Sequence, residues 1–239
     1  MDRKPPQGLF ITGNNTGVGK THVAGLIAES LRKAGKRVGV YKPAASGVVE
    51  VDGKPAWEDV VALWEKSGRI WDTAQICPQT FDAPLAPHLA ARAEGKEIDT
   101  QLLRRGLDFW TKKQAAGECD MILVEGAGGL MSPMSDDDYV ADLALEFGFP
   151  LIVVAANRLG VINETLQTLI AATAYADGLP IAGVVLNDTS AATDDASRAS
   201  NRAELEARCG VPILTHLPFG ATEIPDQIDW LSLADLNRY

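Results

Sequence analysis

A glycine-rich turn near the start of the chain limits its fold more than any other feature of the sequence. An apolar run at 8–12 leads into the turn, and residues 20–34 follow it with helical periodicity. Between them stands Gly-Asn-Asn-Thr-Gly-Val-Gly-Lys-Thr at 13–21. A buried strand, a glycine-rich turn and a helix that opens with Gly-Lys-Thr form the setting in which main-chain amides bind phosphates.

The residue types of this turn suit a triphosphate. Glycine lets N–H groups approach phosphate oxygens without a Cβ clash, and the following helix presents the positive end of its dipole. Lys20 adds a point cation, and the Thr21 hydroxyl is a ligand for Mg²⁺ at the phosphates. The spacing departs from G-x-x-x-x-G-K-[ST], because Gly13 precedes Gly19 by one residue too many and Asn14 stands at the glycine position. A chance glycine-rich turn is the alternative, and the complete strand–turn–helix order argues against it.

Apolar runs alternate with amphipathic stretches along the rest of the chain, which is typical of βαβ units. Several runs are continuously apolar, as expected of strands buried on both faces of a parallel sheet. The sequence therefore predicts an α/β fold of the P-loop NTPase type: a doubly wound, mostly parallel sheet with helices on both faces, in one ATP-binding domain over 1–239. The other predicted strands are 37–41, 121–124, 150–155, 181–186 and 211–217, and the other predicted helices are 57–67, 99–116, 138–147, 162–177 and 196–208.

Two segments do not fit this alternation. The proline-containing segment 68–98 is expected to be irregular and to form part of a substrate pocket. The polar stretch 188–195 is expected to be a surface loop.

The composition excludes some classes of partner. A formal net charge of −10 repels nucleic acid and anionic lipid, so an anionic ligand needs a local site. No apolar run approaches the ~20 residues of a membrane span, and the charged N-terminus lacks a signal-peptide core. The three cysteines and three histidines form no metal-ligand motif, so we expect reduced thiols and no zinc site. We expect a cytoplasmic protein with neither nucleic-acid nor membrane partners.

Charged residues follow two further predicted strands. Lys42 comes directly after the second predicted strand, 37–41. Glu125 ends the third predicted strand, 121–124, and opens the run Glu-Gly-Ala-Gly-Gly. In a doubly wound sheet, ligands bind outside the carboxyl ends of the strands, so both side chains are candidates for the phosphate crevice. Asp59, at the start of a predicted helix, is a candidate ligand for Mg²⁺, and Ser46 lies close after Lys42. A solvated lysine and a helix-start carboxylate are the alternatives for Lys42 and Asp59.

Together these motifs resemble those of the dethiobiotin synthetases, ATP-dependent carboxylases of biotin synthesis. The family loop has the form Gly-Thr-Asp-Thr-x-Val-Gly-Lys-Thr, which has the spacing of residues 13–21, and the family segment Tyr-Lys-Pro-x-x-Ser-Gly matches 41–47. Further family motifs occur in order at 87–88, 94–95, 124–129, 159–163 and 186–188, so the resemblance covers roughly residues 8–220. Asn14 and Asn15 depart from the family's Thr-Asp, and Gly17 stands where some relatives carry an acid.

The resemblance implies a role for each matched residue. Lys42, Lys20 and Thr16 are the implied catalytic residues, and Thr21, Asp59 and Glu125 the implied Mg²⁺ ligands. The implied nucleotide-binding set comprises Gly17, Val18, Gly19, Lys20, Thr21, His22, Asp59, Glu125, Gly126, Ala127, Gly128, Asn187, Asp188, Pro218, Phe219 and Gly220. Within it, Asn187 reads the adenine edge and residues 218–220 form the wall beside the base. The implied substrate-binding set comprises Thr16, Lys42, Ser46, Gly160, Val161, Ile162 and Asn163.

The resemblance also implies a ligase reaction and an assembly. With Mg²⁺ as cofactor and ATP as co-substrate, 7,8-diaminononanoate and CO₂ are joined into the cyclic urea dethiobiotin, with release of ADP and phosphate. Enzymes of this family are homodimers with the substrate at the subunit interface. The amides of Gly160 to Asn163 are then expected to receive the substrate carboxylate from the other subunit, at a helix start.

Three other readings of the sequence remain open at this point. A dimeric ATPase switch normally carries an additional lysine early in its loop, where this chain has Asn14 and Asn15. A related amide-forming ligase normally needs a glutaminase domain with a nucleophilic cysteine, and none of the three cysteines lies in such a context. A nucleotide-binding protein without turnover is the third.

Overall fold

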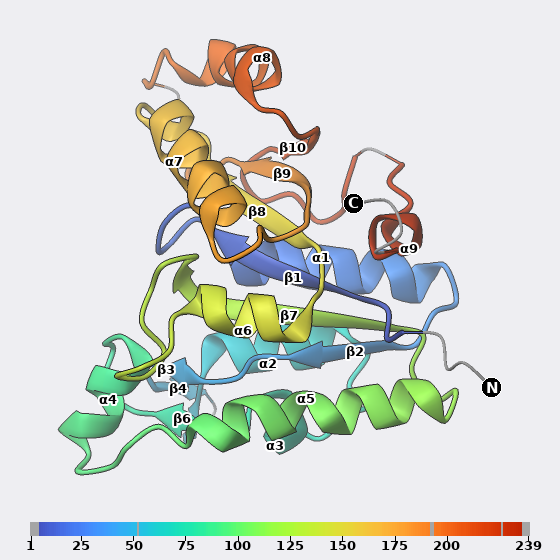
Figure 1. The fold of residues 1–239 in the computed structure, drawn as a ribbon, viewed down its shortest axis with the longest axis vertical. Helices are drawn as coiled ribbons and strands as arrows, with labels where there is room; N and C mark the ends of the chain where they lie inside the picture. The colour runs from blue at the N-terminus through green and yellow to red at the C-terminus, as the bar shows by residue number, and fades with distance from the viewer. Residues whose placement is uncertain (1–4, 52, 192–193, 226, 236–239) are drawn as a thin grey trace.

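The computed structural model describes residues 5–51, 53–191, 194–225 and 227–235. Within these residues, six parallel strands form the central sheet in the order β10-β9-β8-β1-β7-β2 (Figure 1). The strands are β1 (Gly8–Gly13), β2 (Val38–Tyr41), β7 (Met121–Gly129), β8 (Leu151–Ala156), β9 (Ile181–Asn187) and β10 (Ile213–Leu217). All residues of β1, β2 and β8 are buried, which explains their continuously apolar sequences.

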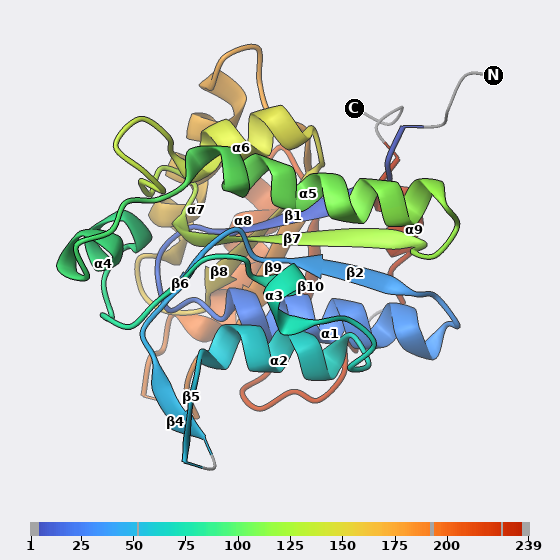
Figure 2. The same cartoon turned by 90° about the horizontal axis from the view of Figure 1, so that it is seen from below.

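Helices cover both faces of this sheet. α1 (Lys20–Lys33) and α2 (Glu58–Lys66) lie on one face, and α5 (Thr100–Ala115) and α6 (Val140–Phe147) lie on the other (Figure 2). α7 (Val161–Ala174) packs on β8, and α8 (Arg198–Arg208) packs beside β10. The short helices are α3 (Thr73–Ile76), α4 (Pro87–Ala93) and α9 (Trp230–Leu233). Among the described residues, no helix combines the length and the apolar character that crossing a bilayer requires.

The predicted α/β class, with a mostly parallel sheet and helices on both faces, is confirmed. All six predicted strands and all six predicted helices occur, with most ends close to those predicted. The third strand is the exception. The prediction that it ends at Glu125 is wrong, because β7 continues to Gly129. Gly129, the last residue of β7, pairs with Gly13 at the end of β1, so two glycines lie opposite one another beside the loop.

The segment 68–98, predicted to be irregular, contains α3, β6 (Thr80–Phe81) and α4. Asp72 caps α3 in a capping box with Gln75, and Pro87 occupies the first turn of α4. β6 pairs in parallel with β3 (Ala45–Ser46), outside the main sheet. These elements are too short for a periodic pattern to reveal them.

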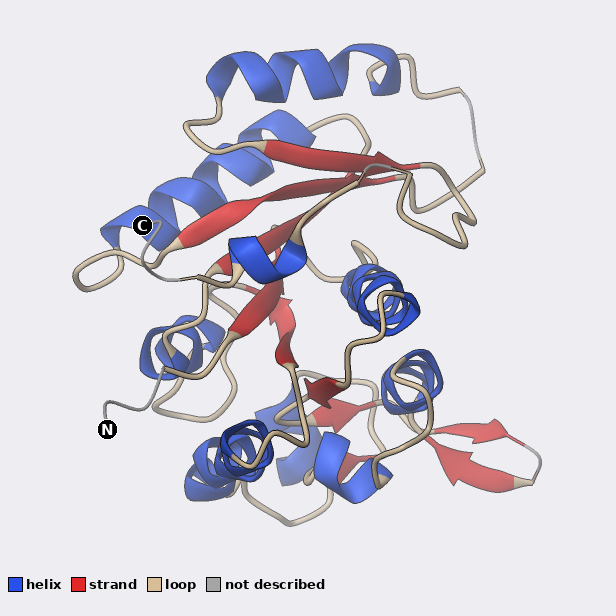
Figure 3. Ribbon diagram, turned by 90° about the vertical axis from the view of Figure 1, so that its right-hand side faces the viewer, coloured by secondary structure: helices blue, strands red, loops and turns tan. Residues whose placement is uncertain are grey.

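Two loops complete the description. β4 (Val49–Val51) and β5 (Lys54–Ala56) form an antiparallel hairpin that projects from the body of the molecule (Figure 2; Figure 3). The stretch 188–195 contains no helix or strand in its described residues, as predicted, while its residues 192 and 193 lie outside them.

α5 approaches the sheet closely at a glycine. A Cβ on Gly106 would lie 2.2 Å from the hydroxyl oxygen of Tyr41 and 2.5 Å from its Cζ atom. The Tyr41 ring is fully buried, and its hydroxyl donates to the carbonyl oxygen of Leu103 at 2.7 Å. Because Lys42 follows Tyr41 directly, this contact fixes the strand end that carries Lys42.

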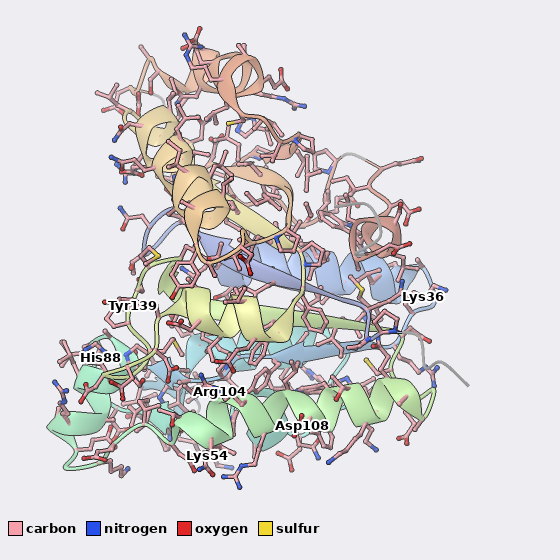
Figure 4. The ribbon with its side chains drawn as sticks, in the orientation of Figure 1. Lys36, Lys54, His88, Arg104, Asp108 and Tyr139 are labelled. Carbon is pink, nitrogen blue, oxygen red and sulfur yellow. The ribbon has the colours of Figure 1, made fainter. Side chains whose placement is uncertain are left out.

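Arg104 joins α5 to α6 and to the loop that precedes α6 (Figure 4). Its guanidinium donates to Asp138 at 2.7 Å and to Glu146 at 2.5 Å. The hydrogen bond from Arg104 lowers the pKa of Asp138, whose carboxylate also accepts from the Ser135 hydroxyl at 2.9 Å. The loop that contains Ser132 is thereby held against α5.

Replacing Gly106 by alanine tests the packing of α5. Alanine forms helices better than glycine by roughly 1 kcal/mol. Here its methyl group meets a buried ring, so we expect Gly106→Ala to lower the free energy of unfolding by about 1–3 kcal/mol. Gly25→Ala in α1 is the matched control, because the added Cβ there meets the flexible side chain of Lys66 at 3.0 Å. Urea unfolding followed by circular dichroism measures both, and a Gly106→Ala protein as stable as the Gly25→Ala protein would contradict this packing.

Candidate functional site

A cavity of about 810 Å³ lies at the carboxyl ends of β1, β2 and β7. Its walls come from the 13–21 loop, the segment after β2, residues 84–87, and the end of β7 with the turn after it. Seven predicted polar and charged site side chains line it together: Thr16, Lys20, Thr21, Lys42, Ser46, Asp59 and Glu125. The sequence predicts that segment 68–98 forms part of a substrate pocket. Four of its residues do line this cavity: Pro84, Leu85, Ala86 and Pro87.

The glycine-rich loop turns into α1 through two left-handed residues. Gly17 has φ 72° and Gly19 has φ 88°, a region that favours glycine. α1 begins at Lys20, directly after the αL residue Gly19, and its first turn carries no acidic side chain. No acidic side chain of this first turn therefore offsets the positive end of the helix dipole or the Lys20 amine at the cavity. Burial lowers the pKa of Lys20, and the attraction of Glu125 opposes that effect.

A compact charged cluster lies opposite this loop. The Lys42 Nζ atom lies 2.6 Å from Glu125 Oε1 and 2.7 Å from Asp59 Oδ2. Thr21 Oγ1 lies 2.8 Å from Asp59 Oδ1 and 2.8 Å from Glu125 Oε1. Lys42 is 3% exposed and Glu125 is 1% exposed, so the solvated-lysine alternative for Lys42 is wrong.

Lys42 and Asp59 stabilise each other's charges, whereas burial raises the pKa of Glu125 against the attraction of Lys42. Burial opposes the charge of Lys42, but the attraction of Glu125 and Asp59 outweighs that cost and raises its pKa, so the amine stays protonated. Burial likewise opposes the charge of Asp59, and the attraction of Lys42 outweighs it and lowers the pKa of that carboxyl. The cluster therefore presents a fixed cation to the cavity.

The same residues fit a hard divalent cation. A hydroxyl has one proton, so Thr21 can donate to only one of the two carboxylate oxygens at 2.8 Å, and the other contact sets two electron-rich oxygens together. In addition, Glu125 Oε2 is buried and has no hydrogen-bond partner among the residues that the structure describes. Two carboxylates and a hydroxyl beside an open cavity are the oxygen ligands that Mg²⁺ takes, with waters and phosphate completing its shell. Within the described residues no group of three or more His, Cys, Asp or Glu side chains is arranged for a metal.

The remaining residues of the loop and of β7 surround this cluster. Thr16 is exposed at the mouth of the cavity, and the Ser46 hydroxyl donates to the Leu85 carbonyl at 2.5 Å. Val18 is buried behind the loop, and His22 is exposed on the first turn of α1, outside the cavity lining. Of the glycine run, Ala127 and Gly128 line the cavity, while Gly126 is buried.

The predicted base-side residues lie outside this cavity. The Asn187 amide donates to the Val18 carbonyl at 2.9 Å, behind the loop, so β9 is tied to the phosphate site. Asp188 accepts from the amide of Asn157 at 2.8 Å. Pro218, Phe219 and Gly220 follow β10 and are exposed, with Phe219 57% exposed. Their roles at adenine stay predictions.

The predicted carboxylate-binding residues also lie apart from the cavity. Gly160 caps the start of α7, Val161 is buried, and Ile162 and Asn163 lie in its first turn. A second cavity of about 450 Å³ is lined by the loop residues 14–16 and by α7 from Glu164 onward, and residues 160–163 line neither cavity. Within one chain the structure therefore does not bring these residues to the phosphate site.

Sequence reasoning missed other residues of the region. Ser132 and Pro133 line the cavity from the turn after β7. Asn157, Asn201 and His216 form a hydrogen-bonded group with Asp188. None belongs to a motif, and only Pro133, as a turn residue, carried a local signal.

The Lys42–Glu125 pair makes a prediction that needs no ligand. Lys42→Met leaves the buried Glu125 carboxylate without its cation, and we expect a loss of roughly 3–5 kcal/mol in the free energy of unfolding. Adding Glu125→Gln should recover a large part of the loss, because a neutral amide needs no countercharge. Urea unfolding of the wild type, both single variants and the double variant measures this coupling. Additive effects of the two substitutions would contradict it.

Comparisons with known proteins show which family this chain belongs to. The family described as "AAA domain" matches residues 7–223. The ATP-dependent dethiobiotin synthetase BioD of Rhodopirellula baltica is 40% identical over 215 residues, covering 86% of this chain and 81% of that protein. The enzyme of the same name from Anaeromyxobacter dehalogenans strain 2CP-C is 44% identical over 199 residues, covering 83% of this chain and 84% of that protein.

A solved structure supports the fold. The signal recognition particle receptor FtsY of Elizabethkingia anophelis superposes with a TM-score of 0.53 at 15% identity, over 96% of this chain and 62% of that chain. This likeness concerns the arrangement of strands and helices, whereas the likeness to the synthetases extends over the sequence. The chain therefore belongs to the family of ATP-dependent dethiobiotin synthetases.

Proposed function

We infer that this protein is an ATP-dependent dethiobiotin synthetase, a ligase of biotin biosynthesis. It closes 7,8-diaminononanoate with CO₂ into a cyclic urea and releases ADP and phosphate. The observation that carries this function is the placement of Lys42, Asp59 and Glu125 across one cavity from the glycine-rich loop, in a chain of this family. The two halves of the cavity suit a triphosphate and the group that attacks it.

In the reaction we propose, one amine of the substrate first adds to CO₂ and forms a carbamate. A carbamate oxygen then attacks the γ-phosphorus, and ADP leaves. The second amine attacks the carbonyl carbon of the resulting carbamic–phosphoric anhydride, the ring closes, and phosphate leaves. Negative charge develops on the transferred phosphoryl oxygens, so the protein contributes mainly by electrostatics and positioning.

The residues of this chain divide that work. Main-chain amides from Gly17 to Lys20 bind the phosphates, and the two ammonium groups of Lys20 and Lys42 face the transferred phosphoryl from different walls. Lys42 is held protonated by Glu125 and Asp59, so it acts as a cation toward the carbamate and phosphoryl oxygens and not as a base. We propose that Thr16 and Ser46, which line the cavity, orient the diamine. Mg²⁺, when held by Thr21, Asp59 and Glu125, supplies further neutralisation of the phosphate charge.

The proposal includes a homodimer. Residues 160–163 line neither cavity of the single chain, although a helix start is a favourable place for the substrate carboxylate. Two large apolar side chains lie exposed near them, Leu159 at 76% and Ile170 at 67%. We propose that a partner subunit covers these side chains and supplies its own residues 160–163 to this cavity.

Sedimentation tests the dimer. We expect the mass of two 25.5 kDa chains for the wild type and of one chain for Ile170→Asp, because a carboxylate in an apolar interface is not solvated. The Ile170→Asp protein should lose turnover but still bind MgATP. A wild type that sediments as a single chain at the concentration of the assay would contradict the dimer.

Labelled bicarbonate tests the reaction. We expect incorporation into an acid-stable cyclic urea that requires diaminononanoate, ATP and Mg²⁺, and that chelation of the metal abolishes. Lys42→Ala, assayed well below its unfolding temperature, should lose roughly 10²–10³-fold in turnover, as expected for one electrostatic donor. Lys36→Ala is the control, because Lys36 lies just before the amino end of β2, away from the cavity at the carboxyl ends of the strands (Figure 4). No label in the product, or near-normal turnover of Lys42→Ala, would contradict the proposal.

A further inference from the structure

Three amide side chains are buried beyond the ends of β8 and β9. Asn157, Asn187 and Asn201 are 1%, 3% and 2% exposed. Asn157 directly follows β8, Asn187 ends β9, and Asn201 belongs to α8. A buried amide is costly unless its donors and its acceptor are paired, so the pairing of these groups determines which segments are held together.

Asn157 is the centre of this group. Its Nδ2 atom donates to Asp188 Oδ1 at 2.8 Å, and its Oδ1 atom accepts from Asn201 Nδ2 at 2.9 Å. Its main-chain N–H donates to the Asn187 carbonyl at 2.8 Å. The side chain and the backbone of one residue thus hold two consecutive residues at the end of β9.

The end of β10 is attached to the same group. His216 Nε2 lies 3.0 Å from Asp188 Oδ1 and 3.3 Å from Asn157 Nδ2. A carboxylate oxygen only accepts hydrogen bonds and the Asn157 Nδ2 atom only donates, so we assign the proton of the ring to Nε2, which donates to Asp188. His216 stands two residues before Pro218, and its contact fixes the strand that leads to residues 218–220.

We propose that Asn157 is a positioning residue for the adenine side of the ATP site. The proposal rests on the proposed function in one respect, the roles of Asn187 and residues 218–220 at the base. These two segments come from neighbouring strands that pair with each other, and Asn157 from the third strand, β8, holds the Asp188 side chain that lies between them. Asn201 fixes the orientation of the Asn157 amide from the opposite side.

The link matters because the base is recognised by shape and by neutral hydrogen bonds. A wall whose two sides are fixed before binding loses little conformational entropy when adenine enters. Without Asn157, the Asp188 carboxylate keeps its contact with His216 but is no longer fixed from β8. The main-chain pairing of β9 with β10 stays, because the Asp188 N–H donates to the Leu217 carbonyl at 2.9 Å, so the change is confined to the orientation of the side chains at these strand ends. The phosphate contacts are built from β1 and α1, so a change at Asn157 should weaken adenine recognition and leave triphosphate recognition nearly unchanged.

Two ligands separate these effects: MgATP carries the base, and magnesium tripolyphosphate does not. Their equilibrium binding to the wild type and to Asn157→Leu is measured by titration calorimetry without diamine. We expect Asn157→Leu to bind MgATP roughly tenfold or more weakly, the equivalent of about one lost hydrogen-bond link, and tripolyphosphate within about threefold of the wild type. Asn201→Ala leaves the Asn157–Asp188 hydrogen bond in place and removes the hydrogen bonds of the Asn201 amide to Asn157, to the Arg158 carbonyl and to the Ser197 hydroxyl. It should weaken MgATP binding by a smaller factor, and it serves if Asn157→Leu does not fold.

Gln114→Leu is the matched control. The Gln114 amide also holds main-chain groups together, accepting from the Gln7 N–H at 2.8 Å and donating to the Asp120 carbonyl at 3.2 Å, at the opposite edge of the sheet. We expect Gln114→Leu to lower the thermal stability of the protein and to leave its affinities for MgATP and magnesium tripolyphosphate unchanged.

The outcomes decide the proposal independently of the catalysed reaction. A selective loss of MgATP affinity in Asn157→Leu supports it even if no dethiobiotin is formed. An equal loss for both ligands, a loss of stability alone, or a wild type that binds ATP no better than tripolyphosphate would overturn it.

Discussion

A protonated lysine and a buried carboxylate, 2.6 Å apart, set the geometry of this protein's phosphate site. Lys42 and Glu125 follow Tyr41 and Val124, which are opposite one another in the parallel register of β2 on β7. Removing either charge from water alone would cost several kcal/mol, so each is tolerated because the other is there. The position of the Lys42 ammonium group is therefore coupled to the register of two neighbouring strands. The packing of α5 on Tyr41 holds that register in place from behind.

The carboxyl edge of the sheet divides into a charged half and a neutral half. β1, β2 and β7 carry the loop, Lys42 and Glu125, and a cluster of fixed charges at that position suits phosphate and a divalent ion. β8, β9 and β10 carry buried amides and a single carboxylate joined by hydrogen bonds. Such a group cannot neutralise an anion, and we propose that it fixes surfaces for a neutral base. The Asn187 amide on the Val18 carbonyl joins the halves.

The elements that periodicity predicted are the ones long enough to bury a face. β1, β8 and α1 are of this kind, and their buried residues are those that the apolar pattern singled out. α3, β6 and the β4–β5 hairpin were missed because two to four residues carry no period. The extension of β7 through its glycines was missed for another reason: strand pairing with β1 decides it, and glycine has no strand preference of its own.

Local sequence determined the phosphate loop, since a strand, the glycines and the helix start lie within about twenty consecutive residues and need nothing from elsewhere to be recognised. Through family resemblance it also pointed to Lys42, Asp59 and Glu125 as members of one site. Only the tertiary structure decided how these three meet Thr21, that Lys42 is buried and protonated, and that the wall includes Ser132. It alone revealed Asn157, Asn201 and His216 as one group with Asp188. Such contacts join residues 28 to 104 positions apart, and their distances follow from strand order and packing, which no local pattern encodes.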